Sequence, residues 1–331
     1  MIKLQTEVDL PDFKRKMGYR HRSVMMGSCF AENIGIYLQD LCFPVTVNPF
    51  GILYNPVSIA NSLGFLIDRK VFTEQDLFYS NGLYNSFSHH SRFSGPDPLN
   101  VLRNINQLAH DASDDLVKCH QLFITFGTSW VFKHKTTGAV VSNCHKLPAS
   151  VFERFRLSVN QITAVWIPVI EQLRRINPEL QLVFTVSPIR HLKDGAHENQ
   201  LSKSTLLLAI DELISKFGQE VTAYFPSYEL MLDELRDYRF YAADMTHPGE
   251  IALEIIREKF VETIMDSEAR AVSAEIGKML PSLKHRPLNN NEPGYVSFVE
   301  KQIERVFNLQ QKYPFIDMKV LIKKFSEKRT D

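Results

Sequence analysis

Two short runs of almost uninterrupted apolar residues constrain the fold of this chain more than any other feature: residues 121–127 and 180–186. Runs of this length without polar alternation are typical of strands that are buried on both faces, as in the middle of a parallel sheet. Shorter runs at 24–26 and 221–225 have the same character, and segments with helical apolar spacing lie between the runs. Buried strands alternating with helices indicate a doubly wound α/β domain, which we expect over residues 20–265.

The last part of the chain has a different pattern. From residue 267 onward no strand pattern is present, and residues 269–283 and 295–313 have the apolar spacing of helices. We therefore divide the chain into an α/β domain at 1–266, with an insertion at about 68–118, and a C-terminal helical extension at 267–331. Such an extension packs on the core or forms a dimer contact, so we expect a monomer or a homodimer.

Four local expectations can be compared directly with a structure. Polar and apolar residues alternate over 2–8, which predicts an edge strand that ends before Pro11. Residues 70–100 are rich in aromatic residues and weakly periodic, which we interpret as a mixed loop and helical segment. A Thr-Gly pair between short apolar runs predicts a hairpin over 130–141. The apolar spacing over 150–176 predicts one long helix.

Composition excludes several classes of function. The chain has 331 residues, of which 38 are Lys or Arg and 38 are Asp or Glu, so its formal charge is zero and lacks the basic excess of nucleic-acid-binding proteins. The N-terminus has no apolar signal region, and no apolar run is long enough to span a bilayer. The four cysteines form no C-x-x-C motif, so we expect reduced thiols. We expect a soluble, cytoplasmic protein without nucleic-acid or membrane partners. The cysteines are Cys29, Cys42, Cys119 and Cys144.

The first candidate for chemistry is the turn that follows the first apolar run. Gly27 permits a tight turn, and the residues after it have helical spacing. Ser28 and Cys29 therefore lie at the carboxyl end of a strand and at the start of a helix, where α/β proteins present reactive groups and where backbone N–H groups stabilise negative charge. Either side chain is a candidate nucleophile.

A candidate base lies near the end of the α/β unit. Asp244 and His247 are three residues apart, just before the last amphipathic helix of that unit. In this arrangement a carboxylate can orient an imidazole while the other ring nitrogen faces a nucleophile. A serine needs such a base, because its hydroxyl is a poor nucleophile at neutral pH. We therefore interpret Ser28, His247 and Asp244 as a catalytic triad.

The segment Gly27-Ser28-Cys29-Phe30-Ala31 is the motif for which the GSCFA-domain family is named, and residues 143–148, 187–191 and 202–204 also resemble that family. Through the Asp-x-x-His pair the chain resembles the wider SGNH/GDSL hydrolase superfamily. The resemblance implies a flavodoxin-like, three-layer α/β/α fold with five parallel strands. It also implies a Ser-His-Asp site for hydrolysis of a small acyl ester, with carbohydrate as one candidate carrier, and no cofactor.

Two blocks depart from the superfamily pattern. The first conserved motif of the superfamily usually reads Gly-Asp-Ser, whereas this chain has Gly27-Ser28-Cys29. Alignment of the motif serine with Ser28, which we favour, makes Ser28 the nucleophile. Alignment with Cys29 makes the nucleophile a thiol. The third block usually contributes an asparagine to the oxyanion hole, but residues 127–130 contain none. We expect Ser28, Gly51 and Ser129 to supply the oxyanion donors, with an asparagine of the second loop as a substitute. Loss of one donor typically costs about 10²–10³ in rate, so a weakly active or inactive ligand-binding protein is one alternative. An O-acyltransferase using the same triad is a second alternative.

Other polar residues complete the expected pocket. The loop histidines lack the tight spacing of metal ligands, so we expect no metal site. The residues expected to bind substrate lie in the loops that follow the predicted strands. They are Asn48, Asn55, Thr128, Arg190 and His191.

Overall fold

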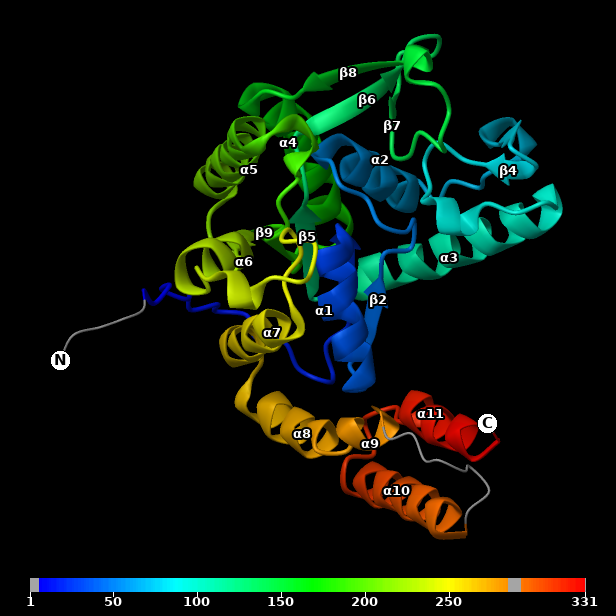
Figure 1. Cartoon of the computed structure of the whole chain (residues 1–331), viewed down its shortest axis with the longest axis vertical. Coiled ribbons are helices and arrows are strands. Elements are labelled where there is room, and N and C mark those ends of the chain that lie inside the picture. The colour runs from blue at the N-terminus through cyan, green and yellow to red at the C-terminus, as the bar shows by residue number, and fades with distance from the viewer. Residues whose placement is uncertain (1–5, 285–292, 331) are drawn as a thin grey trace.

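A five-stranded parallel sheet forms the centre of the chain, as the apolar runs predict (Figure 1). The computed structural model describes residues 6–284 and 293–330. All neighbouring strands of the sheet run parallel, and the strand order is β10-β9-β5-β1-β2. The strands are β1 (Ser23–Gly27), β2 (Val45–Val47), β5 (Gln121–Phe126), β9 (Gln181–Val186) and β10 (Thr222–Tyr224).

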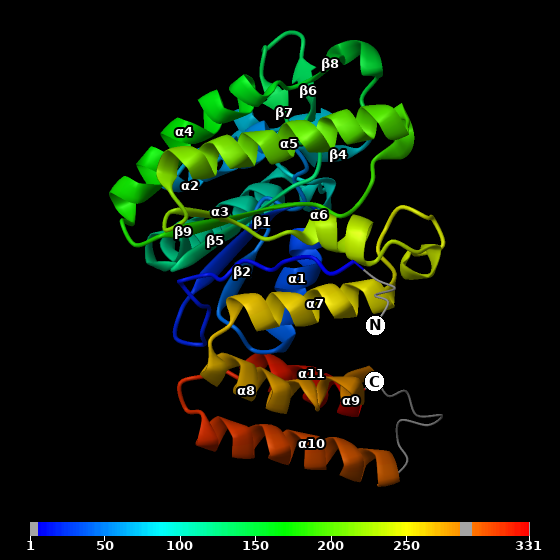
Figure 2. The same ribbon diagram turned by 90° about the vertical axis from the view of Figure 1, so that its left-hand side faces the viewer.

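Helices cover both faces of this sheet. Alternate residues of β5 point to opposite sides: Leu122 and Ile124 belong to one apolar cluster and Phe123 to the other. The first cluster also contains residues of α2 (Pro56–Ile67), α3 (Pro98–Lys118), α4 (Val159–Ile176) and α5 (Ala196–Phe217). The second contains residues of α1 (Cys29–Asp40) and α7 (Glu250–Ile264). The expected three-layer α/β/α fold is therefore confirmed (Figure 2).

Beyond the sheet, the chain ends in a group of helices. These helices lie beyond α1 and α7 (Figures 1 and 2), and Met318 and Phe325 join the second apolar cluster. Among the residues that the structure describes, no helix is both long enough and apolar enough to cross a bilayer. The remaining helices are α6 (Ser227–Glu229), α8 (Ser267–Gly277), α9 (Leu280–Lys284), α10 (Pro293–Lys312) and α11 (Lys319–Thr330).

The expectation of one helix over 150–176 was wrong at its start. Residues Phe152–Arg156 form strand β8, and α4 begins only at Val159. A capping box at Ser158 separates the two: its Oγ accepts the N–H of Gln161 at 3.2 Å, and Gln161 Oε1 accepts the N–H of Ser158 at 2.8 Å.

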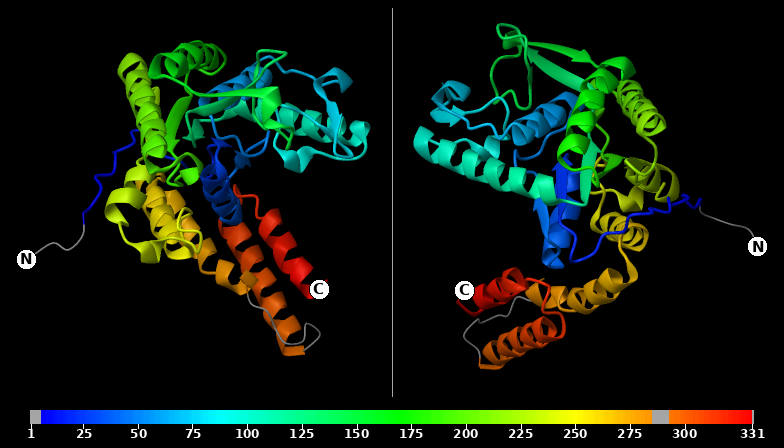
Figure 3. Two further views of the ribbon diagram at one scale, coloured as in Figure 1. Left: turned by 45° about the horizontal axis from the view of Figure 1, so that its top comes forward. Right: turned by 180° about the vertical axis from the view of Figure 1, so that it is seen from behind.

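The expected hairpin is present, and β8 extends it. Strand β6 (Trp130–His134) pairs antiparallel with β7 (Val140–Val141) on one side and with β8 on the other. The resulting three-stranded sheet lies at the opposite end of the molecule from the C-terminal helices (Figure 3).

Residues 70–97 contain two single 3₁₀ turns and a small hairpin of β3 (Phe78–Ser80) and β4 (Leu83–Asn85), so the expected mixture of loop and helical character consists there of short turns and a hairpin, and α3 begins at Pro98. The helix that follows runs from Pro98 to Lys118, and its inner face, including Ile105, joins the core of the sheet. The expected N-terminal strand is absent over residues 6–8, and its first part lies outside the described residues.

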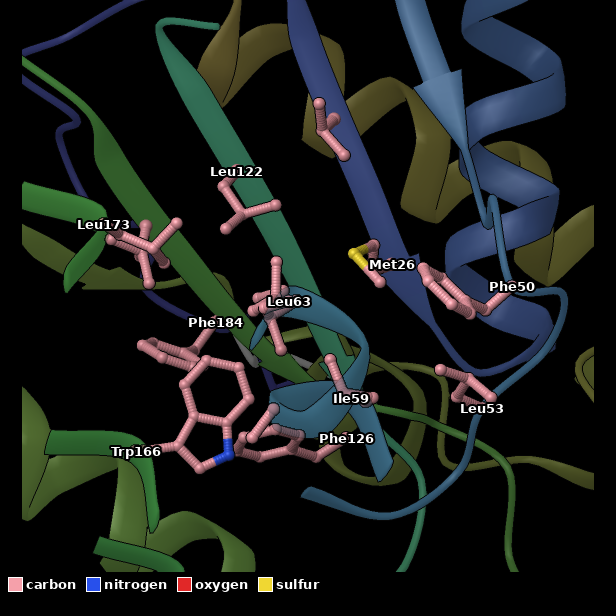
Figure 4. Packing of buried hydrophobic residues seen from close by; sticks show 14 of the residues in the cluster. Met26, Phe50, Leu53, Ile59, Leu63, Leu122, Phe126, Trp166, Leu173 and Phe184 are labelled. Atoms are coloured by element: carbon pink, nitrogen blue, oxygen red, sulfur yellow. The ribbon is translucent and has the colours of Figure 1, made fainter. Parts of the chain in front are cut away.

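The centre of the first apolar cluster is Trp166 of α4, which is fully buried. Its ring packs edge-on against Phe126 and Phe184, with ring centroids 5.2 Å apart in both pairs (Figure 4). Its indole N–H donates to the carbonyl of Pro56 at 3.1 Å. One side chain therefore joins α4, the start of α2 and two strands.

We predict that Trp166→Ala lowers the free energy of unfolding by about 3–5 kcal/mol, because it removes a large buried side chain and leaves a cavity. Leu208→Ala is the matched control: this leucine of α5 is 58% exposed, so its truncation should change stability by less than about 0.5 kcal/mol. Chemical denaturation followed by circular dichroism measures both values. Equal losses in the two variants would contradict the assignment of Trp166 to the centre of the core.

Candidate active site

The turn after β1 depends on a close backbone approach. Gly27 has a φ of +136°, and a Cβ at this position would lie 2.2 Å from the carbonyl oxygen of Thr125. The N–H of Gly27 donates to Asn48 Oδ1 at 2.9 Å, and the N–H of Ser28 donates to the carbonyl of Thr125 at 3.2 Å. Only glycine fits this position without moving a neighbouring strand.

Ser28 is the N-cap of α1. Its Oγ accepts the N–H of Phe30 at 3.3 Å, and the residue is only 1% exposed. The N–H of Ser28 also donates to Thr125, and its carbonyl accepts the N–H of Glu32 at 3.2 Å, so its backbone and its Oγ all have partners at the helix start. A hydroxyl used in this way stabilises the helix start.

Cys29 is the first residue of α1 and is partly exposed. Burial raises the pKa of its thiol, and the negative charge of Glu32 adds to this effect, while the backbone N–H groups of Cys29 and Phe30 and the positive charge of Lys203 act in the opposite direction. The neutral thiol is therefore favoured overall, and the helix N–H groups and Lys203 are the groups that stabilise its negatively charged form.

The second loop contributes Asn48, which is buried and has a φ of +45°. Its Oδ1 accepts the N–H of Gly27, which orients the amide, whereas its buried Nδ2 has no hydrogen-bond partner among the described residues. The N–H of Gly51, an expected oxyanion donor, donates instead to the carbonyl of Asn48 at 2.7 Å. Asn48 Nδ2 is thus a buried donor at this turn that the protein's own hydrogen bonds do not use.

Asn55 has a different environment. It is the N-cap of α2, where its Oδ1 accepts the N–H of Ser58 at 2.8 Å and its Nδ2 donates to Ser58 Oγ at 2.9 Å. Both ends of its amide therefore serve to start a helix.

The third loop is held together by hydroxyl groups. Ser202 Oγ of α5 lies 3.1 Å from Thr128 Oγ1 and 3.0 Å from Ser129 Oγ, and it accepts the N–H of Ser129 at 2.9 Å. Ser129, another expected oxyanion donor, is fully buried. The N–H groups of Gly127 and Thr128 both donate to the carbonyl of Tyr54, at 2.8 Å and 3.0 Å. This network connects the third loop to the second loop and to α5.

Lys203, next to this serine, is 0% exposed. Its Nζ donates to the carbonyls of Gly127 and Ser187, at 2.7 Å and 2.8 Å. Burial lowers its pKa to about 7, and the charge of Arg190 acts in the same direction, whereas Cys29 opposes it. A buried lysine therefore joins the ends of β5 and β9.

Arg190 and His191 follow β9. The backbone N–H of His191 donates to Asn199 Oδ1 at 2.8 Å, and its ring lies edge-on to Tyr54 with centroids 5.9 Å apart. Burial lowers the pKa of His191 to about 4, and the positive charges of Lys203 and His247 add to this effect. The charge of His247, on the Asp-x-x-His loop, therefore acts on His191 in the loop after β9. Arg190 Nε and His191 Nε2 are buried without hydrogen-bond partners among the described residues.

Asp244 and His247 form a pair on the loop before α7. His247 Nδ1 lies 2.5 Å from Asp244 Oδ2, and Asp244 Oδ1 accepts the N–H groups of Thr246 and His247 at 3.0 Å and 2.9 Å. The N–H of His247, together with that of Thr246, holds the pKa of the Asp244 carboxyl far below its usual range. Both side chains are 51% exposed. The carboxylate holds the imidazole through Nδ1, so Nε2 is left for a proton on another group.

The other histidines near these loops have structural partners. His89 stacks on Phe50 with ring centroids 4.8 Å apart, and its Nδ1 lies 2.9 Å from Ser86 Oγ. His145 Nε2 lies 2.8 Å from the carbonyl of Ser86. Across residues 6–284 and 293–330, no group of three or more His, Cys, Asp or Glu side chains has an arrangement that could hold a metal ion.

The sequence alone does not reveal the roles of Tyr54 and Ser202. Tyr54 acts through its backbone carbonyl, which any residue provides, and Ser202 lies among the interior positions of an ordinary amphipathic helix. Lys203 stands beside it in a segment that resembles the GSCFA family, but burial of its ammonium group is a property of the fold.

Comparison with known proteins identifies a family and finds similar solved structures. No curated protein matches the chain. A similar solved structure is an acetyl xylan esterase, Est2A, from the rumen bacterium Butyrivibrio proteoclasticus, with 11% identity and a TM-score of 0.39 over 77% of this chain and 64% of that one. The chain thus spans just under two thirds of that enzyme's length. The family model described as the GSCFA family matches residues 22–260, and that of the GSCFA domain protein C-terminal domain matches residues 276–330. The chain belongs to the GSCFA family.

Proposed function

We propose that this protein is an esterase or deacylase of the SGNH type, with its nucleophile at the N-terminus of α1. The observation that carries the proposal is the Asp244–His247 pair, in which Nδ1 is bound to the carboxylate at 2.5 Å and Nε2 is left for a proton. The charge of His247 acts on His191, and that of Lys203 acts on both His191 and Cys29. These couplings support a single site at the carboxyl ends of the strands.

Within this proposal, the contacts favour Cys29 over Ser28 as the nucleophile. Ser28 is buried, and its Oγ caps α1 through the N–H of Phe30. Cys29 is partly exposed at the first position of the helix, and backbone N–H groups act on its sulfur. Because burial raises the pKa of this thiol overall and the thiolate is the reactive form of cysteine, the proposed nucleophile depends on His247 to take its proton.

The reaction would proceed in two steps. Cys29 Sγ attacks the acyl carbonyl carbon while His247 Nε2 takes the thiol proton, and the C–O bond to the alcohol then breaks as the alcohol oxygen takes that proton back. The acyl group is now a thioester on Cys29. Water attacks the thioester, giving one proton to His247, and the returning thiolate regains it. The products are one alcohol and one carboxylic acid, and the enzyme is unchanged.

Asn48 is our preferred oxyanion donor. The expected donors Ser28, Gly51 and Ser129 each give their N–H to a group within the protein. Asn48 Nδ2 is buried and has no such partner among the described residues, and the bond from Gly27 to Oδ1 holds the amide in place. Preorganised donors of this kind stabilise the developing oxyanion without reorganisation during the reaction.

We propose a small acyl ester as substrate, with a carbohydrate hydroxyl as the alcohol. Arg190 and His191 lie at the β9 end and carry buried ring or guanidinium nitrogens without protein partners among the described residues, so they are available to substrate oxygens. Transfer of the acyl group to a second alcohol would use the same thioester. Product analysis with competing alcohol acceptors distinguishes transferase from hydrolase.

A second candidate function is ligand binding without turnover. It is favoured by the internal hydrogen bonds of three expected oxyanion donors, Ser28, Gly51 and Ser129, which leave fewer groups to stabilise a transition state. The two functions differ in one measurable property, the formation of a covalent acyl intermediate.

The first test compares the two possible nucleophiles with p-nitrophenyl acetate. We expect Cys29→Ala to lower kcat by at least about 10³-fold, because the acyl acceptor is lost. Ser28→Ala should keep its activity and lose about 0.5–2 kcal/mol of stability through loss of the N-cap. Cys144→Ala, which removes another partly exposed thiol, is the matched control and should leave kcat unchanged.

The outcomes separate the alternatives. Loss of turnover in Ser28→Ala but not in Cys29→Ala, with both variants folded, would return the nucleophile to Ser28. Absence of turnover and of acylated Cys29 in the unaltered protein, measured by mass spectrometry with a panel of activated esters, would favour the ligand-binding function.

The second test concerns the Asp244–His247 pair. Asp244→Asn should lower kcat by about 10²–10⁴-fold with little change in KM, because the imidazole loses the carboxylate that orients it and stabilises its protonated form. Asp237→Asn replaces another exposed, turn-capping carboxylate and serves as the control. Steady-state kinetics would contradict the role of Asp244 if both variants had the same kcat.

The third test separates the two ends of the Asn48 amide. Asn48→Asp retains an oxygen that accepts the N–H of Gly27 and removes the Nδ2 donor, so the turn is preserved while the oxyanion loses a partner. We expect kcat to fall by about 10²–10³-fold. Asn55→Asp is the control, because Asn55 caps α2. An unchanged kcat in folded Asn48→Asp would exclude Asn48 as the donor.

A further inference from the structure

We propose that Lys203 is a positioning residue that ties the ends of β5 and β9 together and holds a positive charge against the sulfur of Cys29. The inference rests on the proposed role of Cys29 in the reaction. It assigns to the α5 lysine the stabilisation of the thiolate that attack requires.

The first step of the argument is the position of the ammonium group. Its Nζ donates to the carbonyls of Gly127 and Ser187, the residues that directly follow β5 and β9. The register of these strands pairs Phe126 with Val186, so the two carbonyls lie level with each other. One cation therefore joins two neighbouring strand ends.

The second step is the position of the turn after β1. The register of β1 and β5 pairs Gly27 with Thr125, so this turn, which leads into α1 at Cys29, begins beside the strand end that carries Gly127. Neighbouring strands lie about 4.8 Å apart. The lysine therefore ends beside the turn that carries the thiol, although it comes from a helix about 170 residues further along the chain.

The third step is the charge balance around the ammonium group. Its side chain is fully buried, so the charged form loses its hydration and depends on nearby partners. The two carbonyls accept two of its protons, and the ring of Tyr228 lies with its centroid 5.6 Å from Nζ. Cys29 favours the charged form of Lys203 and Arg190 disfavours it. Lys203 in turn lowers the pKa of His191, and Glu32 raises the pKa of Cys29, against the effect of Lys203.

These observations distinguish the proposal from a purely structural tie. A neutral amide could join two carbonyls without bringing a charge into the protein interior. Cys29 favours the charged form of Lys203, and Lys203 favours the negatively charged form of Cys29. Burial opposes the charged form of each group, so each depends on nearby opposite charge and hydrogen bonds to ionise.

The test measures the titration of Cys29 by its rate of alkylation with iodoacetamide as a function of pH. The experiment uses the full chain in a Cys144→Ser background, with peptide mass spectrometry to identify Cys29. Lys203→Gln keeps an N–H donor for the strand ends and removes the charge, while Lys203→Met removes both. We expect the midpoint of alkylation to rise by at least about 0.5 pH units in both variants, with about threefold slower alkylation at pH 7.

A structural role alone predicts a different result. It would lower the melting temperature, most in Lys203→Met, without moving the alkylation profile of the folded protein. That outcome would overturn the proposal. If the alkylation profile of Cys29 shifts but the unaltered protein has no esterase turnover, the Lys203–Cys29 coupling is retained and the proposed function is rejected. If turnover depends on Cys29 but the alkylation profile does not shift, the proposed function is retained and the role of Lys203 is rejected.

A second measurement leaves the buried lysine in place and does not depend on the Lys203 variants folding. Cys29→Asp puts a fixed negative charge at the first position of α1, where acidic residues stabilise helices, and Cys29→Ala removes the sulfur. The pKa of Lys203, followed by NMR of ¹³C-labelled lysine, should be at least about one unit higher in Cys29→Asp than in Cys29→Ala. Equal values in the two variants would overturn the proposal.

Discussion

The rest of the site depends on the contact of Gly27 with the backbone of Thr125. Residue 27 is a glycine and has no side chain, so its backbone can lie against Thr125 and the chain can turn directly out of β1. The turn then starts α1 at once, with Ser28 as its cap. A bulkier residue would have to displace β1 or β5, which are both central strands, so the position of the reactive residues is linked to the position of the sheet.

The second loop makes this turn rigid. Asn48 accepts the N–H of Gly27, the N–H of Leu53 donates to the carbonyl of Gly27 at 2.9 Å, and Tyr54 accepts the N–H groups at the end of β5. The loop is therefore hydrogen-bonded to the ends of both β1 and β5. Satisfying so many backbone groups internally has a consequence for chemistry, because few donors are left for a substrate. Asn48 Nδ2 is one that remains.

The parts of the fold that the sequence predicts are those with a repeated physical signal. Buried parallel strands need continuous apolar runs, so β5 and β9 are predictable. The start of α4 is not, because Phe152 and Phe155 fit a helical face as well as a strand, and tertiary pairing with β6 decides between them. The Asp244–His247 pair is predictable because both partners lie on one short loop. The burial of Lys203 is not, since charge in the interior depends on residues from three distant segments.

The choice between two consecutive residues is the subtlest part of the site. A serine and a cysteine at a strand-to-helix turn are both plausible nucleophiles, but a helix start treats its N-cap and its first residue differently. The cap turns its side chain back toward the N–H groups of the first turn, as Ser28 does, whereas the next residue is not needed as a cap. A serine is the better cap and a thiol, once deprotonated, the better nucleophile, so the order Ser-Cys gives each residue the position that its chemistry suits.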